Sequence, residues 1–336
     1  MKRSSISLVI FGLIGFSLSL DALTVYSFRH YPADDALFEK FTEQTGIPVE
    51  VVKAKAGALL ERLEAEGDQS PADILITSDA ARLHIATEKG LLQPIDSPIL
   101  KERIPPYLRD PNDNWFGFTQ RARVFVYNPE SVSSKDLTTY EDLANPEWRG
   151  RIVCRSSSNV YNQSLLASVI AADGKDAAIN WAKGVRKNMA RAPQGNDRDQ
   201  IRAVAKGLAD LAIVNTYYVG LMLNSDDHKD RKIAQRLKIF FPNQANRGTH
   251  INISGAGITK ASKNIEDAKA FLEFLASDEA QSTFPNATYE YPVVNEVEWS
   301  EQQKEWGQFK SDTLSLDLLG ENNANAIRVF NLAGWE

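Results

Sequence analysis

Five side chains that can bind a metal ion follow segments predicted to be strands. They are His30, Tyr31, Tyr161, Tyr217 and Tyr218. The first two come directly after the first strand, the third opens a helix after a strand at 151–155, and the adjacent tyrosines follow a strand at 210–214. Ligands of doubly wound sheets bind at the carboxyl ends of strands, so all five side chains are predicted to reach one shared space.

The chemistry of these residues points to a hard trivalent cation. Phenolate is a hard, anionic oxygen donor, which suits ferric iron better than zinc or copper(I). Free tyrosine ionises near pH ~10, so a bound cation must displace the phenol protons, and binding should weaken in acid. Four phenolates around Fe(III) carry one net negative charge, which favours a positive group nearby, and Arg121 or Arg123 could supply it. The alternative interpretation of these arginines is a solvated, salt-bridging strand face.

Each candidate also has an ordinary structural interpretation. Taken singly, a tyrosine near a strand end is more often a packing residue, and His30 a hydrogen-bonded one. The coincidence of all five at strand ends favours the metal site. Among the other histidines, His84 lies mid-helix and His228 in a charged loop, so both are predicted to be packing or surface residues. His250 joins His30 as a candidate for acid–base chemistry in a cleft.

Several common kinds of site are excluded by what the sequence lacks. It contains no G-x-x-x-x-G-K-[ST], G-x-S-x-G, H-E-x-x-H or C-x-x-C motif. The single cysteine, Cys154, permits no internal disulfide and belongs to no zinc-ligand cluster. The glycines at 255–257 lack the third glycine of a dinucleotide motif and are predicted to lie in a strand or turn. The formal net charge of −6 disfavours nucleic-acid binding.

The amino terminus has the pattern of a secretory signal at residues 1–22. Two basic residues precede a mostly apolar run at 6–20, which is shorter than the roughly 20 residues that cross a bilayer. We expect cleavage after Ser19 or Ala22, and the alternative is an uncleaved anchor. Removing residues 1–22 takes away two positive charges and one negative charge, so the net charge changes from −6 to −7. The mature chain is predicted to be acidic, soluble and exported, without a membrane span.

Alternating strands and helices indicate an α/β fold. The length of 336 residues, with 43% hydrophobic and 24% charged residues, is sufficient for two globular domains. After the signal, strands at 23–27, 49–52 and 72–77 alternate with helices at 34–45 and 59–63. This order is a βαβαβ unit, which predicts a parallel sheet with helices on both faces.

A similar order of elements resumes further along the chain. Strands at 151–155 and 210–214 enclose helices at 161–172, 176–188 and 197–206. These elements indicate a second α/β lobe.

Extended segments are predicted to connect the two lobes. The segment at 116–127 is suited to run from one lobe to the next. The strand at 251–259, followed by an amphipathic helix at 265–276, is expected to return the chain to the first lobe. The segment from residue 299 onward is predicted to be helical and to pack on the second lobe. Two lobes joined in this way would leave a cleft that can enclose a small ligand.

The candidate residues and their surroundings resemble those of a known family. The pair His30-Tyr31, Tyr161 within SSSNVYNQSL and Tyr217-Tyr218 within NTYYVG are similar to the iron-ligand set of periplasmic ferric-binding proteins. These proteins serve ABC iron importers, and the likeness is greatest to the Fut/IdiA-type group of cyanobacteria. The segments YEDLANPEWRGRI and VYNPESV also match the pattern of that family. The likeness covers nearly all of the chain after the signal.

The resemblance implies a class II, two-lobed periplasmic binding-protein fold that closes by a hinge around one iron. Each lobe would be a mostly parallel sheet flanked by helices, with hinge crossover strands and the iron site in the cleft. The expected lobes are 23–120 with 250–298, and 121–249 with 299–336. The five residues named above would be the metal ligands, with Arg121 beside the metal, and a carbonate co-ligand would hardly be needed. The implied protein is a periplasmic monomer that delivers Fe3+ to an ABC permease.

Three functions remain to be separated. A binding protein that captures Fe(III) without chemistry of its own is favoured, because the hard-donor cluster has no positioned base or cofactor motif. Charge transfer from tyrosinate to iron would colour it. A mononuclear iron enzyme would need an open coordination position and would show multiple turnover. An oxyanion-binding protein of the same fold would use Arg121 and the backbone amides of residues 156–158, and would stay colourless.

The sequence does not decide whether Fe(II) is also a physiological ligand. We expect it to bind more loosely than Fe(III), because its lower charge compensates less of the cost of deprotonating phenols.

Overall fold

The computed structural model describes residues 22–29, 31–295 and 297–335. The strands are β1 (Leu23–Ser27), β2 (Val49–Lys53), β3 (Ile74–Thr77), β4 (Phe116–Tyr127), β5 (Ile152–Val153), β6 (Leu211–Asn215), β7 (Lys238–Phe240), β8 (Ile251–Ile258) and β9 (Tyr291–Pro292). The α-helices are α1 (Pro32–Thr45), α2 (Ala56–Glu66), α3 (Ala80–Glu88), α4 (Pro98–Arg103), α5 (Val160–Asp173), α6 (Lys175–Asn188), α7 (Asp197–Ala205), α8 (Thr216–Leu223), α9 (His228–Gln235), α10 (Ile265–Leu275), α11 (Asp278–Thr288), α12 (Glu301–Trp306), α13 (Asp317–Glu321) and α14 (Asn323–Ala333). Residues 1–21 of the predicted signal lie outside the described residues.

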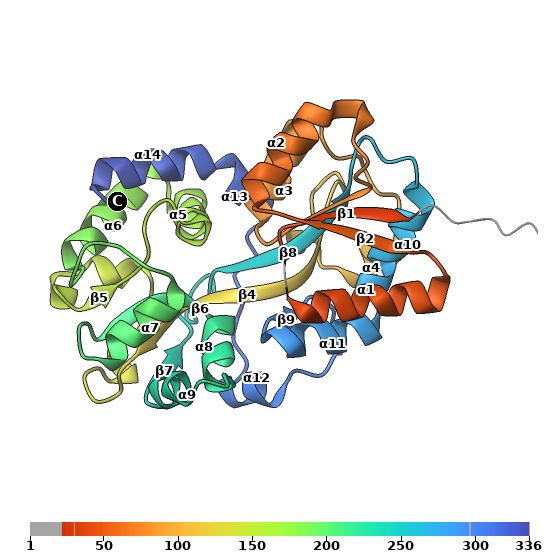
Figure 1. The fold of residues 1–336 in the computed structure, drawn as a ribbon. Helices are drawn as coiled ribbons and strands as arrows, with labels where there is room; N and C mark the ends of the chain where they lie inside the picture. Colours follow the sequence, from red (N-terminus) through yellow and green to blue (C-terminus); the bar gives the residue numbers. More distant parts are fainter. Residues whose placement is uncertain (1–21, 30, 296, 336) are drawn as a thin grey trace, which may run out of the picture.

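The elements form two groups, with the long strands β4 and β8 running across the middle between them (Figure 1). The alternation of strands and helices confirms the predicted α/β class. Within the described part of the chain, no helix combines the length and the apolar character needed to cross a membrane.

The first group contains the predicted βαβαβ unit. β1 pairs in parallel with β2 and with β3, which gives the strand order β2-β1-β3. α1 buries Leu37, Phe38 and Phe41, whose spacing of three and four residues places them on one helix face. The helix ends at Gly46, whose φ of 76° is the left-handed conformation that glycine adopts without strain. These elements fix the loop after β1, where Tyr31 lies.

β4 and β8 connect the two groups. β8 pairs antiparallel with β3 and with β4, and β4 pairs with β8 up to Ala122 and with β6 from Arg123 onward. The described strands form one connected sheet, with the order β2-β1-β3-β8-β4-β6-β5 along its main path. The prediction of a strand at 116–127 that runs from one group to the other is confirmed.

Two glycines in β8 are required by close packing. A Cβ on Gly255 would lie 2.6 Å from the carbonyl oxygen of Phe116, and a Cβ on Gly257 would lie 2.6 Å from that of Asn114. Glycine is suited to places where backbones approach this closely. Both glycines lie within β8, which confirms the prediction that they belong to a strand or turn.

The second group contains the parallel pair β5 and β6 with α5, α6 and α7. β5 is shorter than the predicted strand at 151–155. In the carboxyl-terminal segment, α14 packs against α5 and α6. α13 packs against both α5 and α3, so this segment also contacts the first group, which the sequence does not predict.

The sequence pattern does not predict α11. It places Tyr217 and Tyr218 at a turn between a strand and a helix, but α8 already begins at Thr216, so both tyrosines lie in the first turn of the helix. α11 contains Pro285, a residue that usually ends helices, but the helix is held by burial of Phe284 and its neighbours. His228 begins α9, where a charged loop is predicted.

Candidate metal centre

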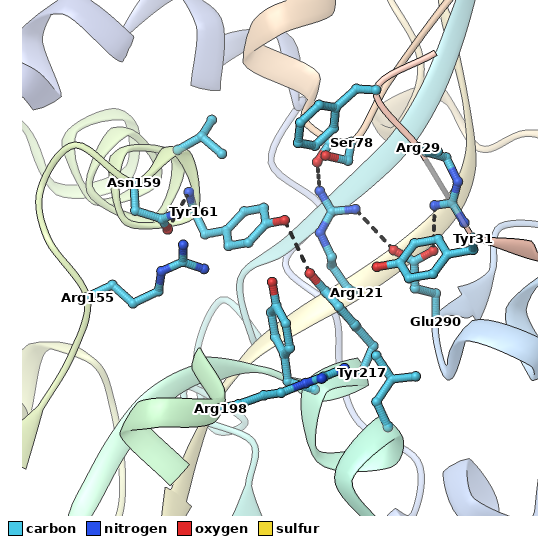
Figure 2. A pocket seen from close by; sticks show the side chains of 14 residues that line it. Arg29, Tyr31, Ser78, Arg121, Arg155, Asn159, Tyr161, Arg198, Tyr217 and Glu290 are labelled. Atoms are coloured by element: carbon cyan, nitrogen blue, oxygen red, sulfur yellow. Dashed lines mark hydrogen bonds and ion pairs between the residues drawn. The ribbon is translucent and has the colours of Figure 1, made fainter. Parts of the chain in front are cut away.

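A cavity of about 310 Å³ contains the described candidate residues. Its lining includes Tyr31, Tyr161, Tyr217, Tyr218 and Arg121. In Figure 2, Tyr161 and Tyr217 point toward one another, and Tyr31 lies on the other side of the Arg121 guanidinium. His30 lies outside the described residues, so its place in the site stays a prediction.

Three phenols come together from the starts of two helices. The hydroxyl oxygens of Tyr161 and Tyr217 are 3.2 Å apart. The rings of Tyr217 and Tyr218 are stacked at a tilt of 30°, with 4.2 Å between their centroids. Oxygen donors from α5 and α8 therefore lie next to one another in space, although 56 positions separate Tyr161 from Tyr217 in the sequence.

Local structure explains why these tyrosines face the cavity. α5 begins after Asn159, whose side-chain oxygen accepts a hydrogen bond from the backbone N–H of Tyr161 at 3.1 Å. α1 begins after Tyr31, whose backbone N–H donates to the Asp34 carboxylate at 3.3 Å. Pro32 then occupies the first helical position, where its missing N–H costs nothing. Each phenol is thereby fixed at a helix start that faces the cavity.

Burial keeps three of the phenols neutral in the absence of a cation. Loss of solvent, helped by the nearby negative charge of Glu290, raises the pKa of Tyr31 to about 12. Burial also raises the pKa of Tyr217 and of Tyr218 above the ordinary value, and the neighbouring phenol of Tyr161 adds to both shifts. A metal ion that binds these oxygens must therefore displace protons.

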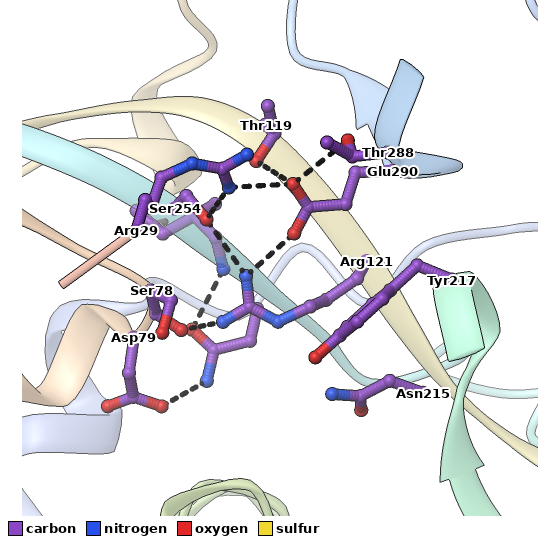
Figure 3. Close-up of polar contacts among 12 residues, drawn as sticks. Arg29, Ser78, Asp79, Thr119, Arg121, Asn215, Tyr217, Ser254, Thr288 and Glu290 are labelled. Carbon is purple, nitrogen blue, oxygen red and sulfur yellow. Dashed lines mark hydrogen bonds and ion pairs between the residues drawn. The ribbon is translucent and has the colours of Figure 1, made fainter. Parts of the chain in front are cut away.

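Arg121 and Arg123 do not form a solvated strand face. Their relative exposures are 1% and 2%, because neighbouring strands and helices cover both faces of β4. Arg121 donates to Ser254 Oγ at 3.3 Å and to the carbonyl oxygen of Ser78 (Figure 3). The alternative interpretation in terms of a solvated face is wrong, and Arg121 lies in the wall of the cavity.

Glu290 holds two arginines at the cavity wall. Its carboxylate accepts hydrogen bonds from Arg29 at 2.8 Å, from Thr119 at 3.0 Å and from Arg121 at 3.3 Å. Burial alone would raise the pKa of Glu290, but the charges of Arg29 and Arg121 outweigh this effect and lower the pKa below the ordinary value. The carboxylate therefore stays ionised and cancels part of the positive charge of the arginines.

The ring of Tyr161 is surrounded by guanidinium groups. The Cζ atoms of Arg121, Arg155 and Arg123 lie 5.4, 5.6 and 5.9 Å from its centroid. These distances are within the range of cation–π contacts. Arg155 and Arg198 also line the cavity, so its wall carries more positive charge than the sequence predicts.

Sequence reasoning misses four charged residues of the cavity wall. They are Arg29, Arg155, Arg198 and Glu290. Arg29 precedes the candidate pair at 30–31 and Arg155 ends a predicted strand, so both could have been found from their positions. Glu290 follows a helix that the sequence does not predict, and nothing in its neighbours indicates a site.

The remaining described histidines lie outside the cavity. His84 contacts Asp317, with 2.5 Å between Nδ1 and Oδ1, so the prediction of a packing residue is confirmed. His250 is 3% exposed, and burial lowers its pKa well below the ordinary value, so it is held neutral away from the phenols. In the described part of the chain, no group of three or more His, Cys, Asp or Glu residues is placed to hold a metal.

Comparison with known proteins gives consistent matches. Residues 69–311 match the model of the family described as "Bacterial extracellular solute-binding protein". Iron uptake protein A1 of Synechocystis sp. is 51% identical over 314 residues, which cover 94% of this chain and 87% of that protein. The major ferric iron-binding protein of Neisseria meningitidis is 28% identical, over 95% of this chain and 94% of that protein.

Solved structures give the same result. The structure of Trichodesmium IdiA (FutA) in complex with iron and citrate has a TM-score of 0.92 and 47% identity, over 94% of this chain and 100% of that chain. The ferric binding protein from Campylobacter jejuni has a TM-score of 0.88 and 47% identity, over 94% of this chain and 100% of that chain.

Proposed function

This chain belongs to the family of bacterial extracellular solute-binding proteins, and we propose that it captures ferric iron and delivers it to an ABC permease. The family and the class II fold predicted from the sequence are confirmed. The relatives named above are described as iron-uptake or ferric-binding proteins, which supports iron as the cargo.

The observation that carries the proposal is the meeting of phenols in one cavity. Tyr161 and Tyr217 have hydroxyl oxygens 3.2 Å apart, Tyr218 stacks on Tyr217, and Tyr31 lines the same cavity. Hard anionic oxygens suit Fe(III), and a set of phenolates would neutralise its charge. In the proposed site these four tyrosines and His30 are the ligands.

The proposed capture is a proton exchange at the phenol oxygens. The buried phenol of Tyr217 is neutral at pH 7, so it loses its proton only when the cation replaces it. Arg121 lies beside the phenols without binding the metal, and its position is fixed by Glu290 and Ser254. Its positive charge would balance the excess negative charge of a four-phenolate site.

The proposal includes the transport setting. After removal of residues 1–22, the chain would act as a periplasmic monomer, which makes the surface of the closed protein available to the permease. The proposed lobes are 23–120 with 250–298, and 121–249 with 299–336, closing over the iron by a hinge in the connecting strands.

Iron content at two pH values tests the proposal. We expect the purified protein to hold one Fe(III) with a visible charge-transfer colour at pH 7, and to lose both at pH 4, because protons then compete for the phenolates. Tyr217→Phe should lower iron affinity strongly and weaken the colour.

Tyr291→Phe is the matched control. It removes a hydroxyl that is buried outside the cavity and has no hydrogen-bond partner in the described structure, so affinity should not change. Equal small effects of both substitutions, or a colourless wild-type protein with added iron, would contradict the proposed site.

An oxyanion is the second candidate ligand, favoured by the arginines of the cavity wall. Arg29, Arg121, Arg155 and Arg198 all line the cavity. The amides of the 156–158 turn are less suited, since the N–H of Ser158 already donates to Ser156 Oγ. Calorimetric titration with phosphate separates the candidates. Phosphate binding without any iron binding would favour the anion, whereas iron binding alone, or with an accompanying anion as in the Trichodesmium complex, would favour the first proposal.

A further inference from the structure

Asp197 is a buried carboxylate at the point where β4, the end of β6 and the segment before α5 meet. It is the first residue of α7 and its relative exposure is 0%. We infer that Asp197 is the positioning residue that sets the relative placement of the phenols of Tyr161, Tyr217 and Tyr218. The inference rests on the proposed function, because it concerns the geometry of the iron site.

The contacts of Asp197 reach each of the three segments. Oδ1 accepts from Arg123 Nη1 of β4 at 2.5 Å and from the backbone N–H of Asn215 at 3.1 Å. Oδ2 accepts from Arg155 Nη1 at 2.6 Å. Charge-assisted bonds of this length are the strongest kind of hydrogen bond in proteins. One carboxylate thus joins β4, the end of β6 and the segment before α5.

The start of α8 depends on this carboxylate. Asn215 is the residue directly before the helix that carries Tyr217 and Tyr218. Its backbone N–H is bound by Asp197, and its side-chain oxygen accepts from Arg123 at 3.1 Å instead of capping the helix. The position of the helix start is therefore set by a charged pair outside the helix.

The start of α5 is connected to the same pair. Arg123 donates from Nη2 to the side-chain oxygen of Asn162 at 2.7 Å, and Asn162 follows Tyr161 directly. The amide nitrogen of Asn162 donates to the carbonyl oxygen of Arg155 at 2.8 Å. Through Arg123 and Arg155, Asp197 is linked on two sides to the turn that presents Tyr161.

Asp197 does not line the cavity, so it acts through other residues. Residues of this kind, which orient the groups that bind a metal, typically change metal affinity by roughly 10- to 100-fold when they are replaced. A buried ion pair can also be structural only. The test must therefore separate the geometry of the site from the stability of the chain.

Asp230 of α9 supplies a matched control, because its arginine partner lies on α7, the helix that begins with Asp197. Its carboxylate receives two hydrogen bonds from Arg202 of α7, at 3.0 and 2.8 Å, and its relative exposure is 8%. It does not line the cavity. Asp197→Asn and Asp230→Asn both remove a buried charge that is paired with arginine, but only the first removes it from the segments that carry the phenols.

The experiment measures iron binding and colour in the full chain. Ferric nitrilotriacetate is the iron source, citrate competition gives the affinity, and the visible charge-transfer band gives the geometry. We expect Asp197→Asn to lower the affinity by roughly 10- to 100-fold and to shift the band maximum. Asp230→Asn should leave both unchanged, whatever it does to the thermal midpoint.

A second variant covers the case in which Asp197→Asn does not fold. Asp197→Glu keeps the charge between Arg123 and Arg155 but moves the carboxylate by one methylene, so it should shift the band while the charge is preserved. Wild-type affinity and band position in the folded Asp197 variants, or equal losses with Asp230→Asn, would overturn the inference. If the wild-type protein itself binds no iron and stays colourless, the proposed function fails instead.

Discussion

Glu290 makes two buried arginines compatible with a cation in the same cavity. Arg29 and Arg121 each carry a positive charge within the wall, and Glu290 lies between them with hydrogen bonds to both. Without this carboxylate, Arg121 would face a bound cation with its charge unpaired, whereas Arg29 would keep its ion pair with the buried Asp34. The carboxylate would therefore act on the proposed iron site through the arginines, without being one of the proposed ligands.

Replacing Glu290 tests whether its carboxylate stabilises the buried arginines. We expect Glu290→Gln to lower the free energy of unfolding by about 3–5 kcal/mol, because it leaves the buried charge of Arg121 without its ion-pair partner and leaves Arg29 with Asp34 alone. Urea denaturation measures the change. Glu298→Gln is the control, because Glu298 forms an exposed ion pair with Lys304 and its replacement should have little effect. Similar small changes in both variants would contradict the assigned role.

The individual residues show which part of the site a sequence can reveal. Tyr31, Tyr161, Tyr217 and Tyr218 are predicted from their places after strands, and all four line one cavity. Glu290 is missed because its partner Arg29 lies 261 positions away, and no local pattern connects two such distant residues.

The elements themselves are predicted best where the apolar pattern is long. β4 has the predicted bounds, because 12 consecutive residues form a nearly continuous buried strand. The bounds of α8 are not predicted, because its apolar residues occur on all sides and it lacks the one-sided pattern of a surface helix. The burial of Arg121 and Arg123 depends on what covers β4 from both faces, which the strand's own sequence does not contain.

Contact between β8 and β4 leads to a prediction at this scale. Gly255→Ala should lower the free energy of unfolding by about 1–3 kcal/mol, because the new Cβ would lie 2.6 Å from the carbonyl oxygen of Phe116 and the strands would have to separate. Chemical denaturation measures the loss.

Gly57→Ala is the matched control for that substitution. Gly57 lies in α2, and an added Cβ meets nothing within 4 Å. Alanine should raise the stability there by about 0.5–1 kcal/mol. A Gly255→Ala variant as stable as the wild-type protein would show that β4 and β8 can separate without cost.

At the scale of the whole molecule, α13 joins the two groups of elements away from the cavity. It packs against α3 of the first group and α5 of the second. The contact between His84 of α3 and Asp317 of α13 raises the pKa of His84 above its ordinary value, chiefly through the hydrogen bond to the carboxylate. The stability of this junction is therefore expected to depend on pH.

The sign of this effect follows from the raised pKa. The pair contributes its full stability below the unfolded pKa of histidine, about 6.5, and loses it as the pH rises through the higher folded value. Asp317→Asn should thus lower the free energy of unfolding at pH 5.5 and have a smaller effect at pH 9. Iron affinity should not change, because His84 does not line the cavity. Equal losses at both pH values would mean that the charge on His84 does not contribute.

The change of partner along β4 falls between two residues with guanidinium groups. Ala122 is the last residue paired with β8 and Arg123 is the first paired with β6, and the Cζ atom of Arg123 lies 5.9 Å from the centroid of the Tyr161 ring. In the proposed hinge closure, a rotation of one group of elements against the other would bend β4 near this point. Such bending would change the spacing of Arg121 and Arg123 around one phenol, so the pivot of the motion and a proposed iron donor would be mechanically coupled.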